Sequence, residues 1–149
     1  ISRFGFERGA PPGSFVMVDG IPHCIGSECG RRLGRLAQHF ELVWATGWEE
    51  RANEHLPFLL GLPFSDLPTL SFDGRAVFGS SHWKVDAIDA YAADRPAAWI
   101  DDNLNEECHA WAQRRSAPTL LVETSPSEGL TDEHVTQLRR WAAGVTAPV

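Results

Sequence analysis

Lysine is almost absent from this sequence, because the 13 basic residues comprise 12 arginines and a single lysine, Lys84. A chain that uses arginine everywhere else has kept one compact ammonium group, which suggests that a point charge is needed at that position. Cysteine is also scarce. Its 3 residues are an odd number, so we expect no disulfide scaffold and a reducing, cytoplasmic compartment.

Long apolar runs are missing as well. None approaches the roughly 18 residues of a membrane span, and no signal peptide is visible, so no membrane partner is expected. The 20 acidic residues give a net charge of −7, which provides no general attraction for nucleic acid. With 149 residues, of which 43% are hydrophobic and 22% charged, the composition is that of one globular domain.

Helical and strand-like patterns alternate from residue 28 onward. Apolar residues at helical spacing predict helices over residues 28–40, 48–60, 81–93, 103–115 and 132–143. Short apolar runs predict strands over residues 42–45, 69–72, 97–100 and 119–122, the second closed by a turn at Asp73 and Gly74. Continuous apolar strands separated by helices indicate a parallel sheet covered on both faces, that is, a doubly wound α/β domain.

Helix caps and the two ends of the chain complete this prediction. Ser81 and Thr131 are the expected N-caps of their helices, and Asp102 or Asn103 that of the helix over 103–115. The first 27 residues differ, because residues 3–6 and 15–18 are β-like pieces of a hairpin or flap around residues 9–13. The single domain over 1–149 therefore consists of a flap-like segment at 1–27, an α/β core at 28–143 and a loose tail at 144–149.

Polar residues follow the predicted strands at the place where such sheets bind ligands, beyond the carboxyl ends. Thr46 and Gly47 come directly after the first strand, and Asp101 and Asp102 after the third. Lys84 lies in the first turn of a helix. Adjacent carboxylates, as at Asp101 and Asp102, are oxygen ligands that suit Mg²⁺. A hydroxyl and N–H groups at the start of a helix, as at Thr46 and Gly47, can bind phosphate oxygens. The ammonium group of Lys84 can neutralise phosphate charge.

The order of these groups resembles motifs two, three and four of the haloacid dehalogenase (HAD) superfamily. The motifs stand as LVWAT at 42–46, HWK at 82–84 and AWIDD at 98–102. The stretch WATGWEERAN at 44–53 is also similar to small HAD proteins related to the HAD domain of RNA-repair proteins. The resemblance covers about residues 28–143 and implies a Rossmann-like HAD core with a Mg²⁺-dependent phosphatase activity that works through an aspartyl-phosphate.

By this resemblance, Thr46 and Lys84 are catalytic residues that bind the phosphoryl group, and Gly47 leaves its N–H free for the same group. Lys84 would also steady the aspartyl nucleophile. Asp101 and Asp102 would hold Mg²⁺, with Asp101 as the more direct ligand. The expected partner is a phosphorylated small molecule or a nucleic-acid end, and neither the substrate nor the oligomeric state can be read from the sequence.

Each of these residue types also occurs in purely structural roles. A lone Thr46 closes a strand or caps a helix, and an Asp pair after a strand caps the helix behind it. Trp48, just past Gly47, packs in a core as readily as it stacks on a substrate. The order along the chain favours the functional interpretation.

Motif one of the HAD enzymes does not occur in this chain. It is an Asp-x-Asp whose first carboxylate attacks phosphorus and whose second is the general acid and base.

Two interpretations of this absence stay open. In the first, motif one lies upstream of Ile1, the first core strand is absent, and the 149-residue chain is inactive as it stands. In the second, residues 15–20 are a degenerate motif one with Met17 at the nucleophile position and Asp19 as the surviving acid. The protein is then a catalytically dead HAD-like protein that binds a phosphorylated ligand or partner. The flap-like sequence and the Ile1 start favour the first.

Overall fold

The computed structural model describes residues 1–6, 9, 11–18, 20–72, 77 and 79–146. Within them the chain forms five α-helices, one parallel pair of strands and one antiparallel hairpin, so the prediction of a mixed α/β fold is confirmed. Asp19 and the predicted turn at Asp73 and Gly74 lie outside the described residues.

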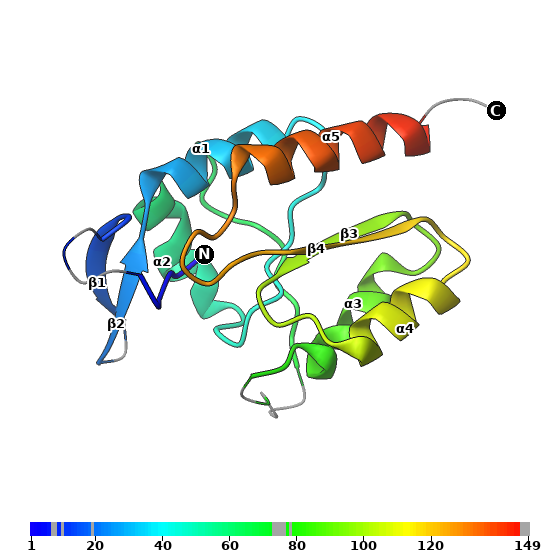
Figure 1. The fold of residues 1–149 in the computed structure, drawn as a ribbon, viewed down its shortest axis with the longest axis horizontal. Helices are drawn as coiled ribbons and strands as arrows, with labels where there is room; N and C mark the ends of the chain where they lie inside the picture. Colours follow the sequence, from blue (N-terminus) through cyan, green and yellow to red (C-terminus); the bar gives the residue numbers. More distant parts are fainter. Residues whose placement is uncertain (7–8, 10, 19, 73–76, 78, 147–149) are drawn as a thin grey trace.

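A parallel pair of strands lies between two layers of helices (Figure 1). In it, β3 (Ala97–Asp101) runs beside β4 (Thr119–Glu123). On one face α1 (Ser27–Leu36) and α5 (Asp132–Thr146) lie side by side (Figure 1). The sheet therefore has helices on both faces, since α3 (Val85–Ala92) and α4 (Glu106–Arg114) cover the other.

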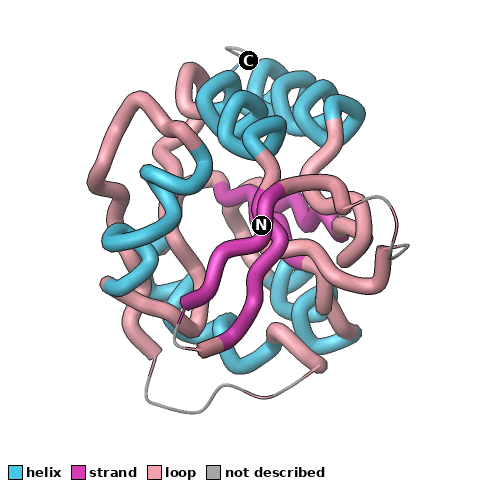
Figure 2. The backbone as a smooth tube through the Cα atoms, turned by 90° about the vertical axis from the view of Figure 1, so that its left-hand side faces the viewer, coloured by secondary structure: helices cyan, strands magenta, loops and turns pink. Residues whose placement is uncertain are grey.

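The second face is covered by α3 (Val85–Ala92), which a short 3₁₀ turn (His82–Lys84) precedes, and by α4 (Glu106–Arg114). The remaining helix, α2 (Arg51–Leu60), packs on α1. Figure 2 looks along the molecule from the hairpin end and shows the strands surrounded by these helices.

Side chains of the parallel pair alternate between two cores, as successive residues of a strand must. Ile100 and Val122 belong to the core under α1, α2 and α5. Trp99 and Leu121 belong to the core under α3 and α4. By the same alternation, Asp101, two residues after Trp99, lies on the face of β3 that α3 and α4 cover.

The predicted strands at 42–45 and 69–72 are reduced to one parallel bridge between Trp44 and Thr69. Pro68 has no N–H with which to extend the ladder. Trp44 packs in the core under α1, whereas Val43 and Ala45 pack in the core under α3. Residues 42–45 thus alternate between the same two cores as β3, although among the described residues β3 pairs with β4 alone. Of the predicted four-stranded sheet, the described residues form one parallel pair, β3–β4, and the separate parallel bridge between Trp44 and Thr69.

The N-terminal hairpin has a different second strand from the one predicted. β1 (Ser14–Val18) pairs with β2 (Ile21–Ile25), and of residues 3–6 only Arg3 joins, through a bridge to Cys24. Gly20 has a φ of 77°, which suits a two-residue hairpin turn. β1 therefore pairs with the segment directly after it, and the predicted pairing of 3–6 with 15–18 was wrong.

Helix ends differ from prediction by a few residues. α1 stops four residues before residue 40, and α2 begins after turns at 48–50, where Glu49 has a positive φ of 48°. α5 continues through Gly144 to Thr146, so the described part of the predicted tail is helical.

Of the predicted caps, the one of α4 was wrong and the one of α5 is confirmed. Asn105, not Asp102 or Asn103, caps α4 by accepting a hydrogen bond from Cys108 N–H at 3.2 Å. Thr131 Oγ1 accepts from the N–H of His134 at 3.3 Å, and His134 Nδ1 accepts from Thr131 N–H at 3.1 Å. Thr131 and His134 thus cap the start of α5 reciprocally.

The three cysteines are buried free thiols. Within the described residues, no helix has both the length and the apolar character that crossing a lipid bilayer requires.

Candidate functional site

The chain's single lysine meets a buried carboxylate at the carboxyl end of β3. Lys84 Nζ lies 2.7 Å from Asp101 Oδ2, and the two side chains are only 13% and 7% exposed. Asp101 is the last residue of β3, and Lys84 ends the 3₁₀ turn that leads into α3. Two residues 17 positions apart in the sequence are thereby held as a buried ion pair.

Ser81 is a part of this cluster that the sequence did not reveal. Its Oγ donates to Asp101 Oδ1 at 2.5 Å, and Asn103 N–H donates to the same oxygen at 3.1 Å. Ser81 is 2% exposed and stands at the predicted N-cap position, before the 3₁₀ turn, but its hydroxyl makes no cap hydrogen bond. A hydrogen bond to a buried carboxylate is stronger than one to a neutral helix N–H.

Opposing effects act on the pKa of Asp101. Burial alone would raise this pKa, but the charge of Lys84 and the hydrogen bonds from Lys84, Ser81 and Asn103 outweigh it and hold the pKa below its usual value. Asp101 is therefore a carboxylate at neutral pH, paired with an ammonium group.

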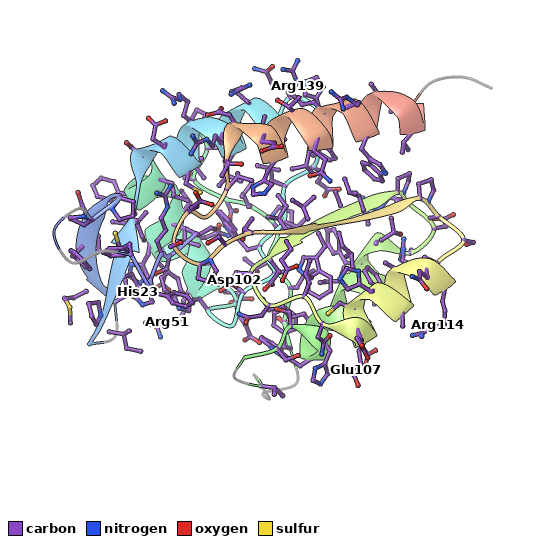
Figure 3. All side chains as sticks on the ribbon, viewed as in Figure 1. His23, Arg51, Asp102, Glu107, Arg114 and Arg139 are labelled. Carbon is purple, nitrogen blue, oxygen red and sulfur yellow. The ribbon has the colours of Figure 1, made fainter. Side chains whose placement is uncertain are left out.

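Asp102 lies just beyond the end of β3, on the side of the molecule where His23 and Arg51 are found (Figure 3). It is half-buried, and its Oδ1 accepts a hydrogen bond from Asn103 Nδ2 at 3.1 Å. Asp101, by contrast, already accepts three hydrogen bonds. Asp102 therefore has more carboxylate lone pairs without a protein donor than Asp101 among the described residues.

Mg²⁺ prefers six oxygen ligands. Among the described residues, no group of three or more His, Cys, Asp or Glu side chains is placed to hold a metal ion. A cation beside Asp102 would therefore need further oxygen ligands from water or another segment.

The loop of Thr46 and Gly47 borders the ion pair through Trp83. A Cβ atom on Gly47 would lie 3.8 Å from the Trp83 ring, and Lys84 Nζ lies 5.4 Å from the centre of the same ring. Thr46 Oγ1 accepts from the N–H of Trp48 at 3.3 Å. The described residues include no hydrogen bond between Thr46 and the ion pair, so the loop lies beside the pair without direct bonding.

Glu49 and Phe72 connect this loop to the ion pair from the other side. Glu49 Oε1 accepts from the N–H of Phe72 at 2.8 Å, and the rings of Phe72 and Trp83 meet edge to face at 4.7 Å. Trp83 Nε1 in turn donates to the carbonyl of Ser80 at 2.9 Å. The loop after residue 45, Phe72 and the 3₁₀ turn before α3 are thus held against one another. Glu49 falls in the stretch 44–53 that carries the resemblance, which is the one signal that could have indicated it.

Trp48 does not offer an open stacking surface. It packs against the core under α1, and the rings of His23 and His55 approach it edge-on at 4.8 and 6.3 Å. Of its two predicted roles the structure shows core packing. Since His23 belongs to β2, the same contact holds the hairpin over the loop of Thr46.

Met17, the proposed nucleophile position of a degenerate motif one, lies in β1 of the antiparallel hairpin and is 63% exposed. It is outside the parallel sheet whose carboxyl end holds Asp101. The structure therefore gives no support to the degenerate-motif interpretation.

The chain matches no protein-family model, no curated protein and no solved structure. The candidate site therefore rests on the motifs and on the geometry of Lys84, Asp101 and their neighbours.

Proposed function

We propose that this chain forms the phosphate- and metal-binding part of a Mg²⁺-dependent phosphatase of the HAD type. The observation that carries the proposal is the buried pair of Lys84 and Asp101 at the carboxyl end of β3. An ammonium group has three N–H donors, and within the described residues Lys84 gives one of them to a protein oxygen. The other two are available to a phosphoryl group.

In this proposal Lys84, the Thr46 hydroxyl and the N–H of Gly47 bind the phosphoryl oxygens. Asp101 holds the ammonium of Lys84 in place, and Ser81 fixes the orientation of Asp101. Donors that are held before the substrate arrives stabilise the charge that develops on phosphorus during transfer.

Asp102, assisted by the remaining lone pair of Asp101, would hold Mg²⁺. Both are hard oxygen donors at the end of one strand, which fits the preference of this cation. When bound, the ion would offset the negative charge of the phosphoryl group as a Lewis acid.

The nucleophilic aspartate would come from upstream of Ile1, in a strand between residues 42–45 and β3. Support comes from the β3–β4 pair and the separate parallel bridge between Trp44 and Thr69, because residues 42–45 and β3 direct their side chains into the same two cores. Such a strand would join residues 42–45 and β3 into one doubly wound sheet. Its carboxylate would attack phosphorus while the bond to the leaving oxygen breaks, and the second aspartate of motif one would protonate that oxygen. Water would then hydrolyse the aspartyl-phosphate, an acyl phosphate, to release phosphate and restore the carboxylate. The substrate would be a phosphorylated small molecule or a nucleic-acid end.

Turnover of p-nitrophenyl phosphate with Mg²⁺ tests the proposal. We expect none from the 149-residue chain and clear turnover from the protein that includes its upstream sequence. In that protein, Lys84→Ala and Asp101→Asn should each reduce kcat about a hundredfold or more. The matched control, Arg31→Gln on the exposed surface of α1, should change it less than about twofold.

Turnover that survives Asp101→Asn would contradict the proposal. If the longer protein shows no turnover but binds phosphate through Lys84, the function is that of a phosphate-binding protein without catalysis.

A further inference from the structure

The surface of α1 and α5 has the opposite charge to the rest of the protein. α1 carries three arginines and one glutamate, and α5 carries two arginines and two acidic residues, so the helix pair has a net charge of +2 in a chain of −7. The two helices lie side by side on the outer face (Figure 1). Anionic ligands are thus repelled by most of the molecule but not by this layer.

Charges are also separated along the two helices. Glu28, Asp132 and Glu133 all lie in first turns. Asp132 forms ion pairs with the guanidinium groups of Arg32 and Arg35, each at 2.7 Å. After Glu133, α5 has no further acidic residue, so the second half of the pair is purely basic.

A cavity of about 470 Å³ lies in this basic half. Two adjacent arginines of α5, Arg139 and Arg140, line it together with His39 from the turn after α1. The hydroxyl-bearing residues Thr136 and Thr146 complete its polar lining, to which no carboxylate of the described residues contributes.

The arginines of this cavity lack the acidic partners that other arginines have. Arg139 donates through Nε to His39 Nε2 at 3.2 Å. In the described part of the chain, its terminal nitrogens and the whole guanidinium of Arg140 have no protein acceptor. Arg95 and Arg115, in contrast, are bound to carboxylates at 2.7 Å.

The walls of the cavity are held together by an aromatic pair. The rings of Phe40 and Trp141 are stacked, with an interplanar angle of 4° and centroids 6.3 Å apart. This contact holds the turn of His39 against α5, which brings the imidazole and the two arginines to the same cavity.

We propose that this cavity is a second anion site, which binds phosphate groups through Arg139, Arg140 and His39. A guanidinium presents paired N–H donors that match two phosphate oxygens. Arg139 projects from the outer side of α5, away from Asp102 (Figure 3). The site is therefore separate from the candidate active site and does not depend on the function proposed for it.

Binding of inorganic pyrophosphate to the ¹⁵N-labelled chain at low salt tests the proposal. We expect amide shifts at His39, Arg139, Arg140 and Thr146. The double variant R139Q/R140Q should weaken this binding roughly tenfold, with an unchanged CD spectrum because both side chains are exposed. The matched control R31Q/R114Q also removes two exposed helical arginines and should weaken binding less than about twofold.

Unchanged binding in R139Q/R140Q, an equal loss in the control, or shifts only around Lys84 would each overturn the proposal. A short single-stranded oligonucleotide, titrated in the same way, identifies the source of the phosphate groups. If its binding needs the same two arginines, the ligand is a nucleic-acid backbone. If pyrophosphate binds there and the oligonucleotide does not, the ligand is a small phosphorylated molecule.

Discussion

The two ends of the β3–β4 pair each carry a buried cation, and the two cations differ in how many hydrogen bonds they make within the protein. At the amino end, Arg115 is 5% exposed and donates to Asp89 at 2.7 Å and to Thr119 Oγ1 at 2.9 Å. It also donates to the carbonyls of Ala93 and Arg95 at 3.1 and 2.8 Å. Nearly all its hydrogen-bonding capacity is used within the protein.

At the carboxyl end, Lys84 is bound to Asp101 alone among the described residues. A fully bonded cation holds elements together and has nothing left for a ligand. A cation that is held in place by one partner and keeps free donors can bind a substrate anion. The comparison therefore assigns Arg115 to stability and Lys84 to the candidate site.

Arg115→Met should have the largest effect on stability. It leaves two carbonyls and a threonine hydroxyl without their donor, and we expect a loss of about 3 kcal/mol in the free energy of unfolding, measured in urea. Arg114→Met, at the exposed neighbouring position, should cost less than about 0.5 kcal/mol. Equal losses in the two variants would mean that the hydrogen bonds of Arg115 do not stabilise the fold.

Lys84→Met should cost about 2 kcal/mol, because it leaves the carboxylate of Asp101 buried with only its neutral donors. The double variant Lys84→Met/Asp101→Asn should cost less than the sum of the two single variants, since the unpaired charge is gone. Strictly additive losses in urea unfolding would contradict the ion pair.

Ser81→Ala should cost about 1.5 kcal/mol, because one hydrogen bond to a buried carboxylate is lost. Ser116→Ala, a serine that is exposed, provides the control and should be neutral within about 0.5 kcal/mol. An unchanged free energy of unfolding for Ser81→Ala in the same urea titrations would mean that Ser81 does not stabilise the Asp101 carboxylate.

Acid should weaken the pair at the carboxyl end. The pKa of Asp101 is lowered in the folded protein, so its contribution is complete above the unfolded value of about 3.9 and is lost as the pH falls through the folded value. The stability difference between the wild type and Asp101→Asn should therefore shrink below about pH 4. Asp89 and Asp132 also have lowered pKa values, and their contribution cancels in this difference. A difference that is constant with pH would contradict the assignment.

The sequence predicted most of the regular structure and part of the site. Apolar periodicity located the helices and the β3–β4 pair, because burial of one face fixes those elements locally. It missed the pairing of Ile21–Ile25 with Ser14–Val18. A proline such as Pro22 argues against a strand in the sequence, yet here it lies within β2, opposite Met17. The motif order placed Lys84 near Asp101, which the structure brings together at 2.7 Å.

Ser81 shows why the rest of the site could not be predicted. A serine before a helix predicts a cap, and only the three-dimensional position of Asp101 shows that its hydroxyl has a stronger acceptor. In the same way, the link from Glu49 through Phe72 to Trp83 joins three loops that are distant in the sequence. Such contacts depend on tertiary packing and leave no local pattern.

The central claim is that Lys84 and its neighbours bind a phosphoryl group. A ¹⁵N NMR titration of the chain with inorganic phosphate and Mg²⁺, repeated with Lys84→Met, tests it most directly. The account predicts shifts at the amides of Thr46, Gly47, Lys84 and Asp102 that Lys84→Met abolishes. Shifts confined to α5, or shifts at these amides that persist in Lys84→Met, would contradict it.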